Sequence, residues 1–395
     1  MQAFDRDTVC SEACEGYLTS LMPDPSGWDY PAFHKFIYSI YGDYISDDPF
    51  QPQEVHLSLT DQISSMKVMW ATAQNLLDPY VEYKLSNASD WNQAKRSSAF
   101  NFTYTVEKKW WPIFEGVLYD ADMTGLEADT KYVYRVAGYD QVNQTIRYSS
   151  EFEFKSAPVI NADRKTVVSV FADHGTIQVL GFSTVEKLFK VQHDIDLDYI
   201  FVAGDLSYAG LDTAFPHLNV SSADELECMW DLLFVQNEPL AARYPWMVGP
   251  GNHEAFYNWT AFTSRYHMPS STDSVGNFWY DYSYGNIHWV SISSEHDLSD
   301  GSPQKTWLDG ALARAVANRK NVPWIIMSIH KPLYCSDSGN SLTTTFAANL
   351  DDLCLKYDVD LVVGGHWHCY GECINSLILV ISLLFILVIF LIMLI

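Results

Sequence analysis

The sequence predicts two unlike domains, an all-β sandwich followed by a layered α/β domain. Between residues 52 and 157, apolar and polar residues alternate with a period of two, the pattern of half-buried strands. From residue 166 onward, apolar strand-like runs alternate with helical stretches, which indicates α/β layering. A chain of 395 residues is long enough for both domains. We therefore expect an N-terminal extension at 1–50, a β-sandwich at 51–158, an α/β domain at 164–373 and a hydrophobic tail at 374–395.

The sandwich is predicted from four short alternating segments, 55–59, 66–70, 132–136 and 152–154. Turn-forming residues separate these segments, and no long helical period intervenes, as is typical of antiparallel sandwiches. The pattern resembles a fibronectin type III domain with Trp70 in its core. No catalytic group of residues is visible in this region. We expect the module to be structural or to pack against the domain that follows.

Charge and composition narrow the class of protein. Aromatic residues make up 15% of the chain and charged residues 18%, which is a globular composition. The formal net charge is −25, so nucleic acid is not an expected partner. Such a surface also repels phosphate-bearing substrates unless a local positive centre is present. Bound cations could provide that centre.

Five Asn-x-Ser/Thr sequons indicate the secretory pathway: Asn87, Asn101, Asn143, Asn219 and Asn258. We expect a secreted, extracellular or lysosomal-type protein, although no signal peptide is visible at Met1. The seven cysteines include no CxxC pair, which argues against a structural zinc site.

Ligand-type side chains follow five of the predicted strands in the α/β domain. In chain order they are Asp173, then Asp205 and Tyr208, then Asn252 and His253, then His330, and finally His366 and His368. The carboxyl ends of neighbouring strands meet at one edge of a sheet, so these residues are expected to converge. A single histidine near a strand end is usually an ordinary polar residue. Five such endings in one domain predict a functional site.

The residue types favour a centre with two metal ions. Hard trivalent iron prefers carboxylate and phenolate oxygens, whereas a softer divalent ion accepts histidine and amide oxygen. The two oxygens of Asp205 point in different directions and can bridge two ions, and Tyr208 can bind as phenolate. If the chain is extended at Trp367, His366 and His368 point to the same side.

The five motifs read ADHG, GDLSY, GNHE, MSIH and GHWH. Their order and form resemble the purple acid phosphatases, within the calcineurin-like metallophosphoesterases. The resemblance implies a four-layer α/β/β/α domain. It also implies a ferric ion held by Asp173, Asp205, Tyr208 and His368. A divalent ion (Zn, Mn or Fe) would be held by Asp205, Asn252, His330 and His366.

The activity implied by the resemblance is hydrolysis of small phosphate monoesters by a metal-activated hydroxide. His253 is then expected to orient the phosphate or to donate a proton to the leaving group. The family often carries further phosphate-binding histidines shortly after the fourth motif, but residues 331–350 contain none. His174 and Lys331 are candidates to substitute for them in part.

Two alternatives to a phosphomonoesterase are open. One is a phosphodiesterase that uses the same site. The other is a non-catalytic adhesion or binding protein, in which the sandwich acts and the second domain is inert. The complete set of ligand residues favours an enzyme. The apolar segment that replaces the family's usual sequence after the fifth motif favours the non-catalytic alternative.

Residues 374–395 are almost wholly apolar and carry no charge. As a helix, the segment would be about 33 Å long, enough to cross a bilayer. A membrane anchor is one interpretation. The other is a chain end that does not belong to the family's fold. In both cases the resemblance implies that the α/β domain lacks its closing strands and is incomplete at its C-terminus.

Overall fold

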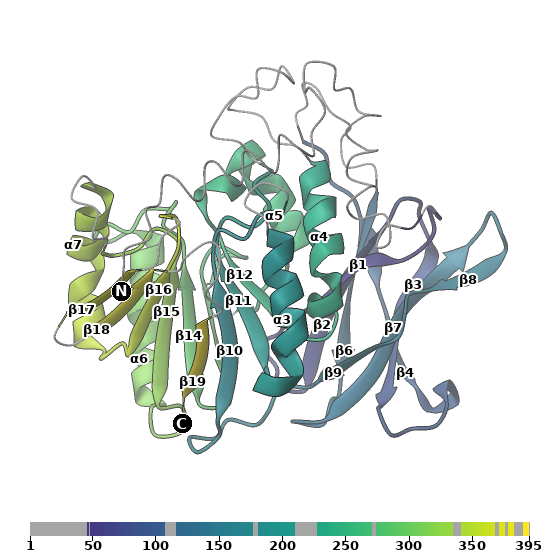
Figure 1. Cartoon of the computed structure of the whole chain (residues 1–395), viewed down its shortest axis with the longest axis horizontal. Helices are drawn as coiled ribbons and strands as arrows, with labels where there is room; N and C mark the ends of the chain where they lie inside the picture. Colours follow the sequence, from purple (N-terminus) through teal and green to yellow (C-terminus); the bar gives the residue numbers. More distant parts are fainter. Residues whose placement is uncertain are drawn as a thin grey trace.

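The computed structural model describes residues 46, 48–106, 116–176, 181–209, 227–270, 274–334 and 341–367, and the backbone of 371–375, 378–382 and 390–394. The N-terminal extension predicted at 1–50 lies almost entirely outside these residues. Two domains lie side by side, the first built from strands alone and the second from layered strands and helices (Figure 1).

The first domain is an antiparallel sandwich of two sheets, as predicted. One sheet has the order β1 (Gln53–Leu59), β2 (Ser65–Thr72), β6 (Val117–Thr124), β5 (Phe100–Phe102). The other has the order β4 (Lys95–Ser98), β3 (Leu77–Leu85), β7 (Lys131–Asp140), β8 (Thr145–Tyr148), with β9 (Phe152–Lys155) also paired to β7. A 3-10 turn, η2, spans Trp91–Gln93. Trp70 is buried in the core and stacks on Tyr119, with ring centroids 5.1 Å apart.

The first sheet of the second domain has the order β12 (Trp246–Gly249), β11 (Tyr199–Ala203), β10 (Thr166–Phe171), β19 (Phe390–Leu394). The pairs β10–β11 and β11–β12 are parallel, and β19 runs antiparallel to β10. Every residue of β11 is buried, as expected for a strand covered on both faces. Helices α3 (Gly181–Ile195) and α4 (Cys228–Ala241) lie on one side of this sheet (Figure 1).

The second sheet has the order β13 (Tyr280–Tyr284), β14 (Ile287–Ile292), β15 (Trp324–Ile329), β16 (Leu361–Gly364), β18 (Ile378–Ser382), β17 (Gly371–Asn375). Helix α6 (Pro303–Ala317) connects β14 to β15, and α7 (Ser341–Lys356) lies between β15 and β16 in the sequence. Three short helices follow β12 and precede β13 in the sequence: η5 (Asn252–Glu254), η6 (Phe256–Trp259) and α5 (Thr260–Arg265).

Successive residues of β14 show how the layers are stacked. Trp289 packs between the two sheets, with its ring centroid 4.5 Å from that of Phe201 in β11. Its neighbour Val290 points to the opposite face and packs in a core cluster with Leu308 and Leu312 of α6. Because side chains alternate across a strand, one sheet can face a second sheet and a helix layer at once. The predicted α/β/β/α order is confirmed.

The apolar tail differs from expectation. The described residues of the segment 374–395 are strands, and the expected boundary between residues 373 and 374 falls inside β17. Strand β18 runs parallel to β16, and β19 extends the other sheet beside β10. A continuous apolar run is the pattern of a strand buried on both faces, and periodicity cannot distinguish it from a buried helix.

Among the residues that the structure describes, no helix has both the length and the apolar character needed to cross a membrane.

A largely buried group of polar and charged side chains joins the two domains, and we call it the Arg265 cluster (Glu54, Tyr104, Glu227, Asp231 and Arg265). Arg265 ends α5, and its side chain is 1% exposed. Its guanidinium donates to the Tyr104 hydroxyl at 2.7 Å and pairs with Glu54 at 3.1 Å and with Asp231. Tyr104 in turn donates to Glu227 at 2.5 Å. Glu54 and Tyr104 belong to the sandwich, so the cluster connects the domains.

Candidate metal centre

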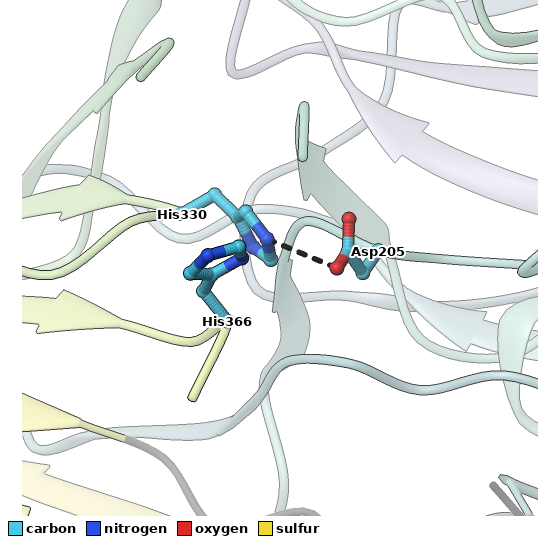
Figure 2. Close-up of side chains that lie close together, drawn as sticks. All are labelled: Asp205, His330 and His366. Carbon is cyan, nitrogen blue, oxygen red and sulfur yellow. Dashed lines mark ion pairs between the residues drawn. The ribbon is translucent and has the colours of Figure 1, made fainter. Parts of the chain in front are cut away.

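The carboxyl ends of strands from both sheets bring three predicted ligands together. Nε2 of His330, after β15, lies 3.0 Å from Oδ2 of Asp205, after β11. His366 follows β16, and its ring centroid is 5.2 Å from that of His330. One ligand atom from each of these residues lies within 4.8 Å of the others, and Figure 2 shows the three side chains converging. This spacing suits a single bound metal ion.

Asn252 completes the group that the sequence predicts for the divalent ion. Its Oδ1 is 3.2 Å from Nε2 of His330. The other ring nitrogen of His330, Nδ1, lies 2.9 Å from the carbonyl oxygen of Ala203 and can donate to it. A histidine held through one nitrogen presents the lone pair of the other to a metal ion. Here that nitrogen faces both Asp205 and Asn252.

The residues predicted for the ferric ion form a second, oxygen-rich group. The Tyr208 hydroxyl donates to Oδ1 of Asp173 at 3.2 Å, and both side chains are buried. Asp173 also accepts the backbone N–H of His366 at 2.8 Å, which connects the group to β16. Burial and the charge of Asp173 raise the pKa of Tyr208 well above its usual value. A bound trivalent cation would reverse that effect and favour the phenolate. The fourth predicted ligand, His368, lies outside the described residues.

The backbone of four candidate ligands lies in the left-handed region. The φ angles are 53° at Asp173, 54° at Asp205, 53° at Tyr208 and 73° at His366. Residues other than glycine rarely adopt this region, and each instance costs on the order of 1 kcal/mol or more. Such strain is concentrated at functional sites, where the surrounding fold holds it in place.

Gly204 also has a positive φ, 85°, and is packed tightly. A Cβ atom at this position would lie 2.6 Å from Nδ1 of His330. The glycine of the GDLSY motif therefore allows the His330 ring to approach the strand end that carries Asp205.

The charges at the centre depend on one another. Burial alone would raise the pKa of Asp205, but the adjacent His330 holds it well below its usual value. Burial alone would lower the pKa of His330, but Asp205 raises it to about 10. Burial and the charge of His330 lower the pKa of His366 to about 4. In the described part of the chain, the ion-pair partners of Asp205 are histidines, and a metal ion can take over the role of their protons.

The donor set fits the implied pair of ions. The carboxylate of Asp173 and the phenol oxygen of Tyr208 lie together, and a hard trivalent ion prefers such oxygen ligands. The imidazole nitrogens of His330 and His366 lie together near Asp205, and the amide oxygen of Asn252 adjoins His330; a divalent ion accepts these ligands.

His253 lies against both groups of ligands. Its backbone N–H donates to Oδ1 of Asp205 at 3.0 Å, and its ring centroid is 4.3 Å from that of Tyr208. Its Nε2 is 4.0 Å from Oδ2 of Asp205. The side chain is 12% exposed, so it reaches solvent, whereas Asp205 and Tyr208, which it contacts, are buried. A proton donor to a departing group needs such a position.

Glu254 is a residue to which the sequence analysis assigned no role. Its buried carboxylate accepts the backbone N–H groups of Asp205 at 2.8 Å, Leu206 at 2.7 Å and Gly251 at 2.8 Å. It therefore fixes the loop after β11 to the loop after β12. Burial and the charge of Asp205 raise its pKa to about 7. The available signal was the glutamate that ends the GNHE motif.

The two candidates for a substitute phosphate ligand are placed differently. His174 is buried, and its Nε2 lies 2.9 Å from Oδ1 of Asn237 in α4. Lys331 directly follows His330, and its Nζ pairs with Glu295 at 2.7 Å. His174 is thus enclosed in the core, whereas Lys331 adjoins a candidate ligand and is partly exposed.

The sequons at Asn87, Asn101, Asn143 and Asn258 are exposed. Asn219 lies outside the described residues. Glycosylation at the five positions stays a prediction.

Comparison with known families agrees with this architecture. Residues 167–370 match the calcineurin-like phosphoesterase family, and residues 52–156 match the N-terminal domain of purple acid phosphatases. The fold and the convergent ligand residues thus define a calcineurin-like metallophosphoesterase. With the sandwich placed before it, the chain belongs to the purple acid phosphatases.

The purple acid phosphatase PPD1 from yellow lupin (Lupinus luteus) seeds has the same fold, with a TM-score of 0.73 and 20% sequence identity. The comparison covers 85% of this chain and 65% of the lupin chain.

Similar curated proteins include probable purple acid phosphatase 20 of Arabidopsis thaliana, 28% identical over 82% of this chain and 69% of its own length. Probable inactive purple acid phosphatase 24 of the same plant is 26% identical over 83% of this chain. The phosphoenolpyruvate phosphatase of Allium cepa is 27% identical over 82% of this chain. This chain spans 57% and 64%, respectively, of the lengths of the latter two.

Proposed function

We propose that this protein is an acid phosphatase that hydrolyses phosphate monoesters at a binuclear centre of Fe(III) and a divalent ion, Zn, Mn or Fe. The observation that carries the proposal is the position of Asp205. Its carboxylate contacts Nε2 of His330 at 3.0 Å, and its backbone carbonyl accepts the N–H of His174, next to Asp173, at 2.8 Å. A carboxylate in that position can serve two ions at once.

The proposed roles follow from the donor types. Asp173, Asp205, Tyr208 and His368 would hold the ferric ion, and Asp205, Asn252, His330 and His366 the divalent ion. When bound, the ions supply positive charge for the phosphoryl oxygens and lower the pKa of a water molecule so that it can attack phosphorus.

The protein's own groups have separate tasks. The Ala203 carbonyl keeps the Nε2 lone pair of His330 directed at the centre. Glu254 holds the two ligand loops at a fixed distance through three backbone N–H groups. His253 contacts the centre and solvent, so it can donate the proton that the leaving alkoxide requires.

The overall charge of the protein bears on the size of its substrate. The net charge of −25 opposes binding of nucleic acid, so we propose small phosphate esters as substrates. Four exposed sequons support a protein of the secretory pathway.

The proposal is tested by metal analysis and by a chromogenic phosphate-ester assay between pH 4 and 7. Two metal ions per chain and hydrolysis of the ester are expected. The ferric–phenolate pair should give a visible absorption band that Tyr208→Phe removes. His253→Ala should keep both ions and lose roughly 10²–10⁴-fold in turnover.

A folded protein without metal or turnover would contradict the proposal and favour the non-catalytic binding protein. Preferential cleavage of a phosphodiester would change the proposed substrate class. Loss of metal from His253→Ala would show that His253 is structural.

A further inference from the structure

We propose that Lys331 is a fixed cation at the rim of the metal centre that binds the phosphoryl oxygens of the substrate, an inference that rests on the proposed function. Lys331 directly follows the candidate ligand His330 at the end of β15. Ser294 and Glu295 lie just beyond the end of β14, which is the parallel neighbour of β15. The three residues therefore meet at the sheet edge where the ligands converge.

Three hydrogen bonds close a ring among these residues. The backbone N–H of Lys331 donates to Oγ of Ser294 at 3.2 Å. The Ser294 hydroxyl donates to Oε1 of Glu295 at 2.8 Å. The other carboxylate oxygen, Oε2, accepts from Nζ of Lys331 at 2.7 Å. Both ends of the lysine are held, so little side-chain entropy remains to be lost when a ligand binds.

Burial distinguishes this ion pair from an ordinary surface pair. The Lys331 side chain is 17% exposed and the Glu295 side chain 13%. Surface pairs between mobile side chains contribute about 0–1 kcal/mol, and many have no measurable effect. Here a second hydrogen bond fixes each partner, and the pair adjoins a candidate ligand.

The ammonium group has donors left for a ligand. A lysine ammonium has three N–H donors, and in the part of the chain that the structure describes Nζ has one partner, Glu295. The Lys331 charge also acts on His366, where it adds to burial and to the charge of His330 in lowering the pKa. The Lys331 ammonium group therefore acts on the ligand at the end of β16 and directly follows the ligand at the end of β15.

A fixed cation beside the metal centre would help an anionic substrate to bind. The protein carries a formal charge of −25, so a phosphate dianion approaches against a repulsive field. Lys331 would contact oxygens that do not bind the metal ions and would stabilise a monoester dianion more than a diester monoanion. The Glu295 carboxylate keeps the ammonium group in place while no substrate is bound.

The test compares Lys331→Gln, Lys331→Arg and Lys305→Gln in the metal-loaded protein. Lys305 is a matched control, because it pairs with Asp300 at 2.6 Å and its side chain is 16% exposed. Binding of inorganic phosphate is measured by calorimetry, KM and kcat are measured with a monoester, and metal content and thermal unfolding are recorded for each variant.

Lys331→Gln should keep its metal and bind phosphate roughly 10- to 100-fold more weakly, the value of a charge-assisted hydrogen bond. KM for the monoester should rise by a larger factor than kcat falls. Lys331→Arg should restore most of the phosphate affinity, and Lys305→Gln should match the wild type. Unchanged phosphate affinity in Lys331→Gln, with turnover intact in the wild type, would overturn this inference alone.

The proposed function can fail separately. If wild-type protein binds phosphate through Lys331 but hydrolyses no ester, the function is wrong and the cation site stands. If metal-loaded wild type binds no phosphate, both proposals fall. A phosphate affinity that drops equally in Lys331→Gln and Lys305→Gln would show an effect of overall charge, and the inference would also fall.

Discussion

The Arg265 cluster and the candidate metal centre both bury carboxylates, but they balance the negative charge differently. In the Arg265 cluster, one guanidinium is bonded to Glu54, Asp231 and Tyr104 and is part of the chain. In the metal centre, the described ion pairs of Asp205 involve histidines, which are cations only when protonated. The chain thus supplies a permanent cation between its domains, whereas the centre relies on protons or metal ions.

The difference has a thermodynamic consequence. A buried carboxylate that is paired with an arginine of the same chain keeps its partner at any metal concentration. A centre that binds ions only when folded is stabilised in proportion to the logarithm of the free metal concentration. We therefore expect chelation to weaken the α/β domain near its ligands and to leave the contact between the domains intact.

The largest expected effect is on Asp205. Asp205→Asn keeps an oxygen that can accept the His253 N–H but removes the charge shared by the two groups of ligands. We expect loss of both ions and of all measurable phosphatase activity, checked by metal analysis and assay. The control is Asp231→Asn, the same substitution at an ion-paired aspartate of the Arg265 cluster, which should keep both ions. Full metal content in Asp205→Asn would disprove the bridging role.

The second prediction concerns Arg265. Arg265→Gln leaves Glu54 and Glu227 buried without the guanidinium that now compensates them. We expect a loss of about 3–5 kcal/mol in the free energy of unfolding, measured by urea denaturation in a chelating buffer. Arg96→Gln, which removes a 59% exposed arginine, should cost less than about 1 kcal/mol. Similar costs for the two variants would show that Arg265 is not the cation that holds the domains together.

The smallest expected effect is on the pH dependence of the free energy of unfolding, through Glu238 at the contact between the domains. Glu238, in α4, accepts the backbone N–H of Val55 at 3.0 Å, and burial raises its pKa from 4.5 to about 7. A carboxyl group with a raised pKa in the folded state stabilises the protein below its unfolded pKa, and this contribution is lost as the pH rises to about 7.

Glu238→Gln should therefore reduce the loss of stability between pH 5 and pH 7.5 by about 1–3 kcal/mol relative to wild type. Urea denaturation of the metal-free proteins at the two pH values measures this difference. Identical pH dependence in wild type and variant would show that Glu238 does not take up a proton on folding.

Sequence alone predicted the elements whose signals are local. The alternating segments at 55–59 and 66–70 became β1 and β2, because successive side chains of a strand point to opposite faces and give a period of two. The residues Asp173, Asp205, Asn252, His330 and His366 converge as expected, because each follows a strand whose carboxyl end meets the same edge.

Other features have no local signal. The positive φ angles of Asp173 and His366 depend on contacts with distant segments, because His366 N–H bonds to Asp173. The carboxylate of Glu254 finds its partners on another loop. The tail was left open between an anchor and a chain end outside the fold, because a continuous apolar run has no periodicity that separates a strand from an apolar helix; its described residues are strands.

The pairing of β19 with β10 determines the order in which the protein can be assembled. Thr166 pairs with Leu394 and Val170 with Phe390, so β10, at the start of the second domain, pairs with a strand that is synthesised much later. Chains emerge from the ribosome N-terminus first, and contacts between distant residues form slowly. The sandwich, whose strands pair within a short stretch of chain, can fold during synthesis. We expect the sheet edge next to Asp173 to be completed only after β19 has been synthesised.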